Sequence, residues 1–135
     1  MRKPILFFCL LVFCSCSPTS LDDYQREGQL LCRHLAKELK NIYTREELLK
    51  SELMIKKKFD ELVELIIEAR EYQVKHPDEY VLAGEENPFS EELLFELKRL
   101  YTQIEGGREI IERAQKESLI RLDGFEKKLQ KKKLH

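Results

Sequence analysis

The stretch from Leu21 to Lys75 contains no proline and a single glycine, Gly28, among residues that favour helices. Apolar side chains recur along it mostly at three- and four-residue steps, as one face of an α-helix requires. They are Tyr24, Leu31, Leu35, Leu39, Ile42, Leu49, Leu53, Phe59, Leu62, Ile66 and Ala69. With charged residues at 36% and only five glycines and four prolines, the composition is also that of a helical protein. The stretch therefore predicts a long amphipathic helical arm.

Prolines mark the gap between this arm and a second one. His76-Pro77 ends the first arm, because the residue before a proline is pushed out of the helical region. Asn87-Pro88 fits an N-cap followed by proline in the first helical turn. The apolar stripe then runs to the end of the chain in phase across Gly106-Gly107, which we interpret as a kink or a close helix contact. We expect helices at about 21–75 and 88–133, with an acidic loop at 76–87.

Two such arms predict an all-α fold, a long antiparallel helical hairpin or coiled coil roughly 70 to 80 Å in length at 1.5 Å per residue. The alternative is a three-helix bundle with a break near Thr44, where Thr44-Arg45-Glu46-Glu47 has a capping-box pattern. One bent helix is favoured, because turns without glycine or proline are less common than kinks. A two-helix hairpin buries one stripe per helix, so self-association or docking onto a protein partner should add stability.

The first residues have the layout of a secretory signal peptide. A basic start, Arg2 and Lys3, precedes the apolar run from Ile5 to Phe13, and small residues follow. A run of nine residues is about half of the ~20 that a membrane-spanning helix needs. The segment is therefore predicted to direct export rather than to span a bilayer.

The end of this segment, Val12-Phe13-Cys14-Ser15-Cys16, resembles the lipobox of bacterial lipoproteins. In that motif apolar residues and then a small residue precede a cysteine, and here Ser15 is the small residue and Cys16 the cysteine. Phe13 stands where leucine is usual. The resemblance covers about sixteen of the 135 residues and implies nothing about the rest of the chain.

The resemblance implies signal cleavage between Ser15 and Cys16, an S-diacylglyceryl group on the Cys16 thiol, and acylation of the new amine by a fatty acid such as palmitate. It divides the chain into a signal peptide (1–15), a lipidated tether (16–20) and one helical domain (21–135). The expected location is the periplasmic side of a cell membrane, with the membrane lipid itself as a partner through Cys16. In enteric-type sorting, Ser17 directs a lipoprotein to the outer membrane.

Charge is distributed unevenly along the domain. Seven acidic and no basic residues lie between Pro77 and Leu97, whereas six basic residues follow from Arg121 onward. In the hairpin the acidic loop lies at the far tip and the basic tail returns toward Cys16. Lysines near an anionic leaflet contribute about 1 kcal/mol each, so the tail predicts membrane contact. The lysines concerned are Lys127, Lys128, Lys131, Lys132 and Lys133.

The sequence contains little that indicates catalysis. His34, His76 and His135 are far apart, and none belongs to a metal-ligand spacing such as HExxH. Phosphate-binding and nucleophile motifs are missing, and adjacent acidic pairs such as Glu46-Glu47 are better explained by solvation than by acid-base work. A formal net charge of -1 gives no basic field for nucleic acid. We predict no enzyme activity, no cofactor, no metal and no nucleic-acid partner.

These observations favour a non-enzymatic, lipid-anchored envelope protein that interacts with or scaffolds another component. One alternative is a pilot or adaptor lipoprotein for assembly of a secretion or outer-membrane component. Another is a structural spacer between membrane and cell wall. Small helical spacers commonly end in a lysine that is linked to peptidoglycan, whereas this chain ends Lys133-Leu134-His135.

Overall fold

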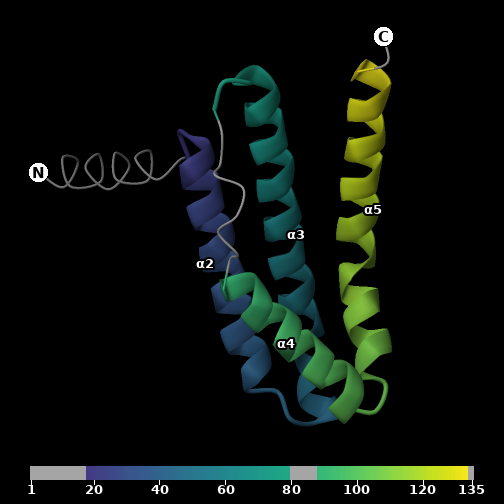
Figure 1. The fold of residues 1–135 in the computed structure, drawn as a ribbon. Helices are drawn as coiled ribbons and strands as arrows, with labels where there is room; N and C mark the ends of the chain where they lie inside the picture. Colours follow the sequence, from purple (N-terminus) through teal and green to yellow (C-terminus); the bar gives the residue numbers. More distant parts are fainter. Residues whose placement is uncertain (1–17, 80–87, 134–135) are drawn as a thin grey trace, which may run out of the picture.

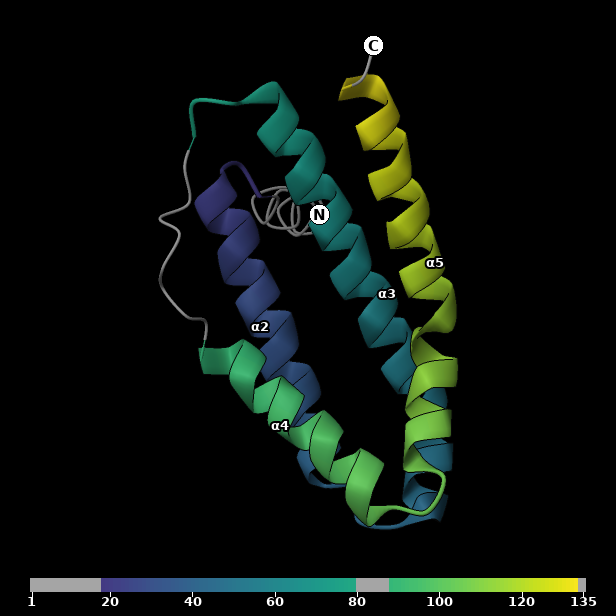
Figure 2. The same ribbon diagram turned by 45° about the vertical axis from the view of Figure 1, so that its right-hand side comes forward.

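The computed structural model describes residues 18–79 and 88–133, those at 88–90 by their backbone alone, and this part of the chain forms four helices. They are α2 (Leu21–Lys40), α3 (Arg45–Lys75), α4 (Pro88–Gln103) and α5 (Gly107–Lys133), drawn in Figure 1. The predicted all-α class is confirmed. The four helices form two hairpins, α2–α3 and α4–α5, which lie side by side (Figures 1 and 2).

The outer limits of the two predicted arms are right, but neither arm is one continuous helix. The first arm ends at Lys75 and the second begins at Pro88, as expected. Each arm turns back within itself, at residues 41–44 and 104–106, so each is a complete antiparallel hairpin. The predicted rod of 70 to 80 Å is therefore wrong, because the longest helix, α3, has 31 residues and spans about 46 Å at 1.5 Å per residue.

The first turn is made by Thr44 and Glu47, and the favoured single bent helix is wrong at this point. Thr44 has an extended backbone, and its Oγ1 accepts a hydrogen bond of 3.1 Å from the Glu47 amide. The Glu47 carboxylate accepts one of 2.8 Å from the Tyr43 amide. Ile42 within the turn and Leu48 after it are both part of the core, and their burial anchors the turn. The capping contacts of Thr44 thus start a new helix without glycine or proline. The break near Thr44, predicted as the alternative, is present.

The second turn depends on the glycine pair. Gly106 has φ +70°, a left-handed conformation that glycine adopts without strain. Gly107 is buried and packs against the last turns of α4, where a Cβ atom would lie 2.2 Å from the Leu100 carbonyl oxygen. The interpretation of this pair as a kink is wrong, because α4 ends here and α5 starts. The expected close contact is present, and it is made with the backbone of α4.

The two hairpins run in the same direction, so that α2 lies beside α4 and α3 beside α5, each as a parallel pair. Polar contacts between α3 and α5 follow one another in order along both helices. They join Glu52 to Arg113, Lys56 to Glu117 at 2.9 Å, Asp60 to Ser118, and Glu64 to Arg121 at 3.1 Å. This order fixes the register of the parallel pair, because sliding one helix by a turn would mismatch every contact at once.

The core lies in the half of the bundle where all four helices meet. Its most deeply buried apolar residues are exposed by 2% or less: Leu35, Ala36, Leu39, Leu48, Ile55, Leu100, Ile110, Ile111 and Ala114. The core cluster extends from Cys32 to Ala114, so a polypeptide that begins at residue 16 carries all of it. Because α4 is much shorter than α3, the described residues in the other half of the bundle belong mainly to α2, α3 and α5 (Figure 2).

Candidate functional site

The N-terminal segment is held against the end of α3 and the residues that follow it by two polar contacts, which share the Tyr72–Glu79 pair. The Tyr72 hydroxyl donates to Glu79 Oε1 at 2.7 Å and lies 3.2 Å from the Thr19 carbonyl oxygen. The Leu21 amide donates to Glu79 Oε2 at 3.3 Å. Ser20 caps α2 by accepting from the Asp23 amide, and the Asp23 carboxylate in turn accepts from Thr19. The direction in which the chain leaves the bundle is therefore fixed from Thr19 onward.

Aromatic packing supports these contacts. The Tyr72 ring stacks on His76 at 4.1 Å between centroids and lies 5.6 Å from the ring of Tyr24. The hydrogen bond to Glu79 raises the pKa of Tyr72, and the same bond, aided by the Leu21 amide, lowers the pKa of Glu79. The ionised carboxylate of Glu79 is thus the form that holds α2 and α3 together at this end.

We expect Tyr72→Phe to raise the pKa of Glu79 toward its ordinary value, because the largest cause of its lowering is removed. A carboxylate with a lowered pKa in the folded state stabilises the fold above its ordinary pKa, and this contribution is lost as pH falls through the lowered value. The Tyr72→Phe variant should lose part of that acid-dependent stability. An NMR titration of the Glu79 carboxyl carbon measures the shift, and an unchanged midpoint would contradict the assigned hydrogen bond.

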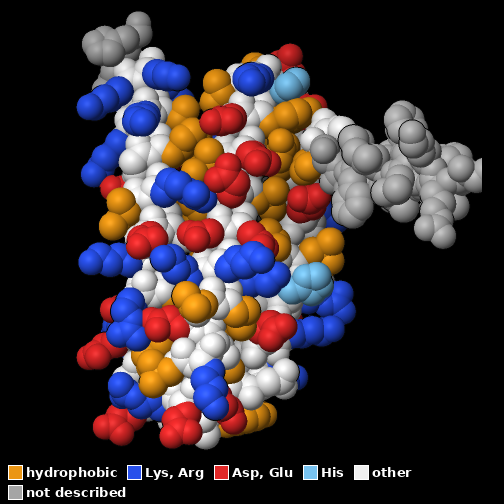
Figure 3. All heavy atoms as spheres, turned by 180° about the vertical axis from the view of Figure 1, so that it is seen from behind, with side chains coloured by type: hydrophobic (Ala, Val, Ile, Leu, Met, Phe, Trp, Pro, Cys, Tyr) orange, Lys and Arg blue, Asp and Glu red, His pale blue; other side chains and the backbone are white. Residues whose placement is uncertain are grey.

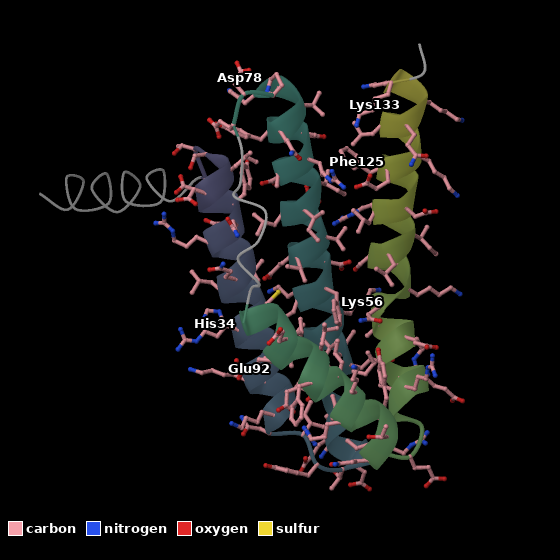
Figure 4. All side chains as sticks on the ribbon, in the orientation of Figure 1. His34, Lys56, Asp78, Glu92, Phe125 and Lys133 are labelled. Atoms are coloured by element: carbon pink, nitrogen blue, oxygen red, sulfur yellow. The ribbon has the colours of Figure 1, made fainter. Side chains whose placement is uncertain are left out.

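Both ends of the described chain lie at this same end of the bundle. Figure 4 shows Asp78 and Lys133 together at one end, with His34 and Glu92 in the other half. Lys133, the last described residue of the basic tail, lies at the same end of the bundle as the contact of Thr19 with Tyr72. The return of the tail toward Cys16 stays a prediction, because Cys16 lies outside the described residues. The prediction that the acidic loop is at the far tip is wrong for residues 76–79. The unexpected turn at 41–44 reverses the chain once more and brings α3 back to the starting end.

The last turns of α5 and the end of α3 enclose a groove of about 420 Å³. Phe125 and Leu129 form its apolar floor, and three of the predicted membrane-contact residues, Lys128, Lys131 and Lys132, form its rim together with Glu71. We call these six residues the basic groove. Of the other two predicted residues, Lys127 pairs with Asp123 at 3.0 Å and Lys133 ends the helix. The sequence identified the lysines, but it did not show that they border an apolar floor.

A second groove, of about 640 Å³, lies between α2 and α3, and its acidic rim was not anticipated. Leu30, Leu31 and Leu65 form its floor. Its polar and charged lining consists of Glu27, Asp60, Glu61, Glu64, Glu68, His34 and Arg121. We call the floor and this lining together the acidic groove. Figure 3 shows apolar side chains between α3 and α2 with acidic ones beside them, and lysines and arginines along the outer edge formed by α5.

Two carboxylates that line the acidic groove, Glu27 and Glu68, differ from their neighbours in their ion pairing. Glu64 is paired with Arg121 and Glu61 with Lys58, whereas no ion pair of the described residues includes Glu27 or Glu68. Burial, followed by the charges of Glu68, Glu27 and Glu71, raises the pKa of Tyr24. No local sequence signal shows that Glu27 and Glu68 line one groove, because they are brought to it by the pairing of α2 with α3.

Within residues 18–79 and 88–133, no group of three histidine, cysteine or acidic side chains is placed to hold a metal ion. The same residues contain no buried polar side-chain atom that lacks a hydrogen-bond partner. Within them no helix has the length and apolar character to cross a membrane. The Ser15–Cys16 junction, the expected signal peptide and residues 80–87 of the acidic loop lie outside the described residues.

No family model, curated protein or solved structure matches this chain.

Proposed function

We propose that the chain is a bacterial envelope lipoprotein, anchored through lipid on Cys16, whose helical bundle acts by binding rather than by catalysis. The lipobox-like sequence before Cys16 supports the anchor. The observation that carries the proposal is that the N-terminal segment and the lysines of α5 lie at the same end of the bundle. A lipid anchor and a basic surface act together only when both can reach the same membrane.

Chain geometry limits how far this end can lie from the anchor. Thr19 is three residues after Cys16, and an extended chain covers at most about 3.6 Å per residue, so the separation is at most about 11 Å. The contact of 3.2 Å between the Tyr72 hydroxyl and the Thr19 carbonyl oxygen would keep the bundle within that distance of the anchor. One fatty chain gives marginal membrane attachment, whereas the two or three chains on a lipoprotein cysteine give a durable one. The bundle then extends away from the bilayer with its four-helix half outermost.

The decisive experiment is mass spectrometry of the mature N-terminus, together with fractionation of cells that express the Cys16→Ala variant. We expect a mature chain that begins at Cys16 and carries a diacylglyceryl group and an amide-linked fatty acid. The Cys16→Ala variant should lose this modification and should no longer sediment with membranes. Ser15→Ala is the matched control, because it keeps a small residue before the cysteine. An unmodified N-terminus at another residue would refute the proposal.

The acidic groove favours a second candidate, a pilot or adaptor lipoprotein. Two unpaired carboxylates, Glu27 and Glu68, border a floor that includes Leu30, which is 48% exposed. Such a surface complements a basic amphipathic segment of another protein, since apolar anchors fill the floor and cations neutralise the rim. Recovery of one stoichiometric partner from detergent-solubilised membranes would favour this candidate over a general scaffold.

A further inference from the structure

We infer that the basic groove binds an anionic phospholipid, with the phosphate held by Lys128, Lys131 and Lys132 and the glycerol and upper acyl chain lying on Phe125 and Leu129. This inference rests on the proposed function, because the lipid surface must lie at this end of the bundle. It goes further because it assigns one site and one class of ligand, whereas a basic tail alone predicts only a general attraction to a membrane.

The floor of the groove is open because α5 has a single helical neighbour there. Among the described helices α5 packs against α3 and α4, and α4 covers only the other half of the bundle. Phe125 and Leu129 are four residues apart, so they lie on one face of α5, and both are only partly buried. An apolar strip at the membrane end, bordered by cations, fits an amphiphile better than it fits a small inorganic anion.

The rim has more positive charge than the bundle neutralises. Lys128, Lys131 and Lys132 lie within little more than one turn, and within the described part of the chain none of them takes part in an ion pair. Glu71 is the one carboxylate of the groove. Lysines in the last turn of a helix interact favourably with the helix dipole, and this alone can explain a basic helix end. It does not explain why the lysines border an apolar floor. A phosphate-bearing amphiphile accounts for both features.

The test uses the mature polypeptide, residues 16–135 with Cys16→Ser, so that binding does not depend on acylation. Its binding is measured to two kinds of vesicle, one of phosphatidylcholine alone and one of phosphatidylcholine and phosphatidylglycerol in equal amounts. The triple variant Lys128→Ala, Lys131→Ala, Lys132→Ala should bind the anionic vesicles on the order of 100-fold more weakly, since each lysine near such a surface contributes about fivefold. Circular dichroism checks that each variant keeps its helix content.

The matched control removes three exposed lysines from the opposite end of the bundle, Lys37, Lys40 and Lys50. It changes net charge equally, and two of its lysines also lie in the last turn of a helix, so it reproduces the dipole effect. We expect less than about a threefold loss of binding from this control. A second variant, Glu71→Gln, should strengthen binding by about fivefold, a gain that misfolding would not produce.

Three results would overturn the inference. An equal loss of binding from the control and from the groove variant would show a general charge effect. Displacement of the protein from the vesicles by millimolar inorganic phosphate would show a phosphate site without a lipid preference. Equal binding of the Cys16→Ser polypeptide to both kinds of vesicle would show that anionic lipid is not recognised. Each of these outcomes leaves the mass-spectrometric test of Cys16 unaffected, so the failure of this inference is distinguishable from failure of the proposed function.

Discussion

Gly107→Ala is expected to lower the free energy of unfolding by about 3 kcal/mol, which corresponds to a melting temperature lower by roughly 10 to 20 °C. The added Cβ would lie 2.2 Å from the Leu100 carbonyl oxygen and 3.3 Å from Ile104 Cβ. The first of these atoms belongs to the backbone of α4, which cannot move without opening the turn between α4 and α5. Chemical denaturation followed by circular dichroism measures the loss.

Gly124→Ala is the matched control, because Gly124 lies within α5 and a Cβ atom there would meet nothing within 4 Å. It should raise stability by about 0.5 to 1 kcal/mol, since alanine favours the helix over glycine. The two identical substitutions in neighbouring parts of the chain are thus expected to have opposite signs. Equal effects at both positions would contradict the close contact between Gly107 and the backbone of α4.

Arg99→Ala is expected to cost about 3 kcal/mol of stability, because it leaves a buried carboxylate without its cation. Arg99 donates to Glu96 Oε2 at 2.8 Å and to the Leu39 carbonyl oxygen at 2.8 Å. The side chains of Arg99 and Glu96 are only 15% and 7% exposed, so water cannot replace these bonds. The guanidinium carbon also lies 5.5 Å from the centre of the Tyr43 ring.

The exposed pair of Arg108 and Glu112 supplies the comparison. Its separation is also short, 2.9 Å, but its side chains are 72% and 56% exposed. Arg108→Ala should therefore change the free energy of unfolding by no more than about 0.5 kcal/mol. If both arginine variants prove equally mild in urea titrations, Glu96 is reached by solvent and the buried pair is not a structural element.

Local signals in the sequence predicted the ends of the helices, and long-range packing decided the rest. Pro77 and Pro88 act on their own neighbours, so the limits at Lys75 and Pro88 follow from sequence alone. The turn at Thr44 is also encoded locally, but a capping box competes with a continuous apolar stripe. The core contacts of Ile42 and Leu48, which sequence does not show, decide that competition.

Glu96 shows most clearly what sequence reasoning missed. It belongs to the run of acidic residues between Pro77 and Leu97 and has no feature that separates it from its neighbours. In the fold it is 5% exposed, because α4 turns that face toward α2 and supplies Arg99 three residues later. The two grooves have the same origin, since each is lined by residues that are far apart in the sequence. The lysines of α5 were identifiable, whereas their neighbours Phe125 and Glu71 were not.

The four helices alternate in direction, so the described chain ends at the same end of the bundle at which it begins. Labels at chosen residues can therefore be placed at either end of the bundle. A fluorophore placed at Lys133 lies at the same end of the bundle as the start of α2, close to the basic groove. A label at Glu105, in the exposed turn between α4 and α5, lies at the opposite end, separated by about the 46 Å length of α3. Energy transfer between these two positions reports whether the bundle keeps its full length, because opening of the helices would change their separation.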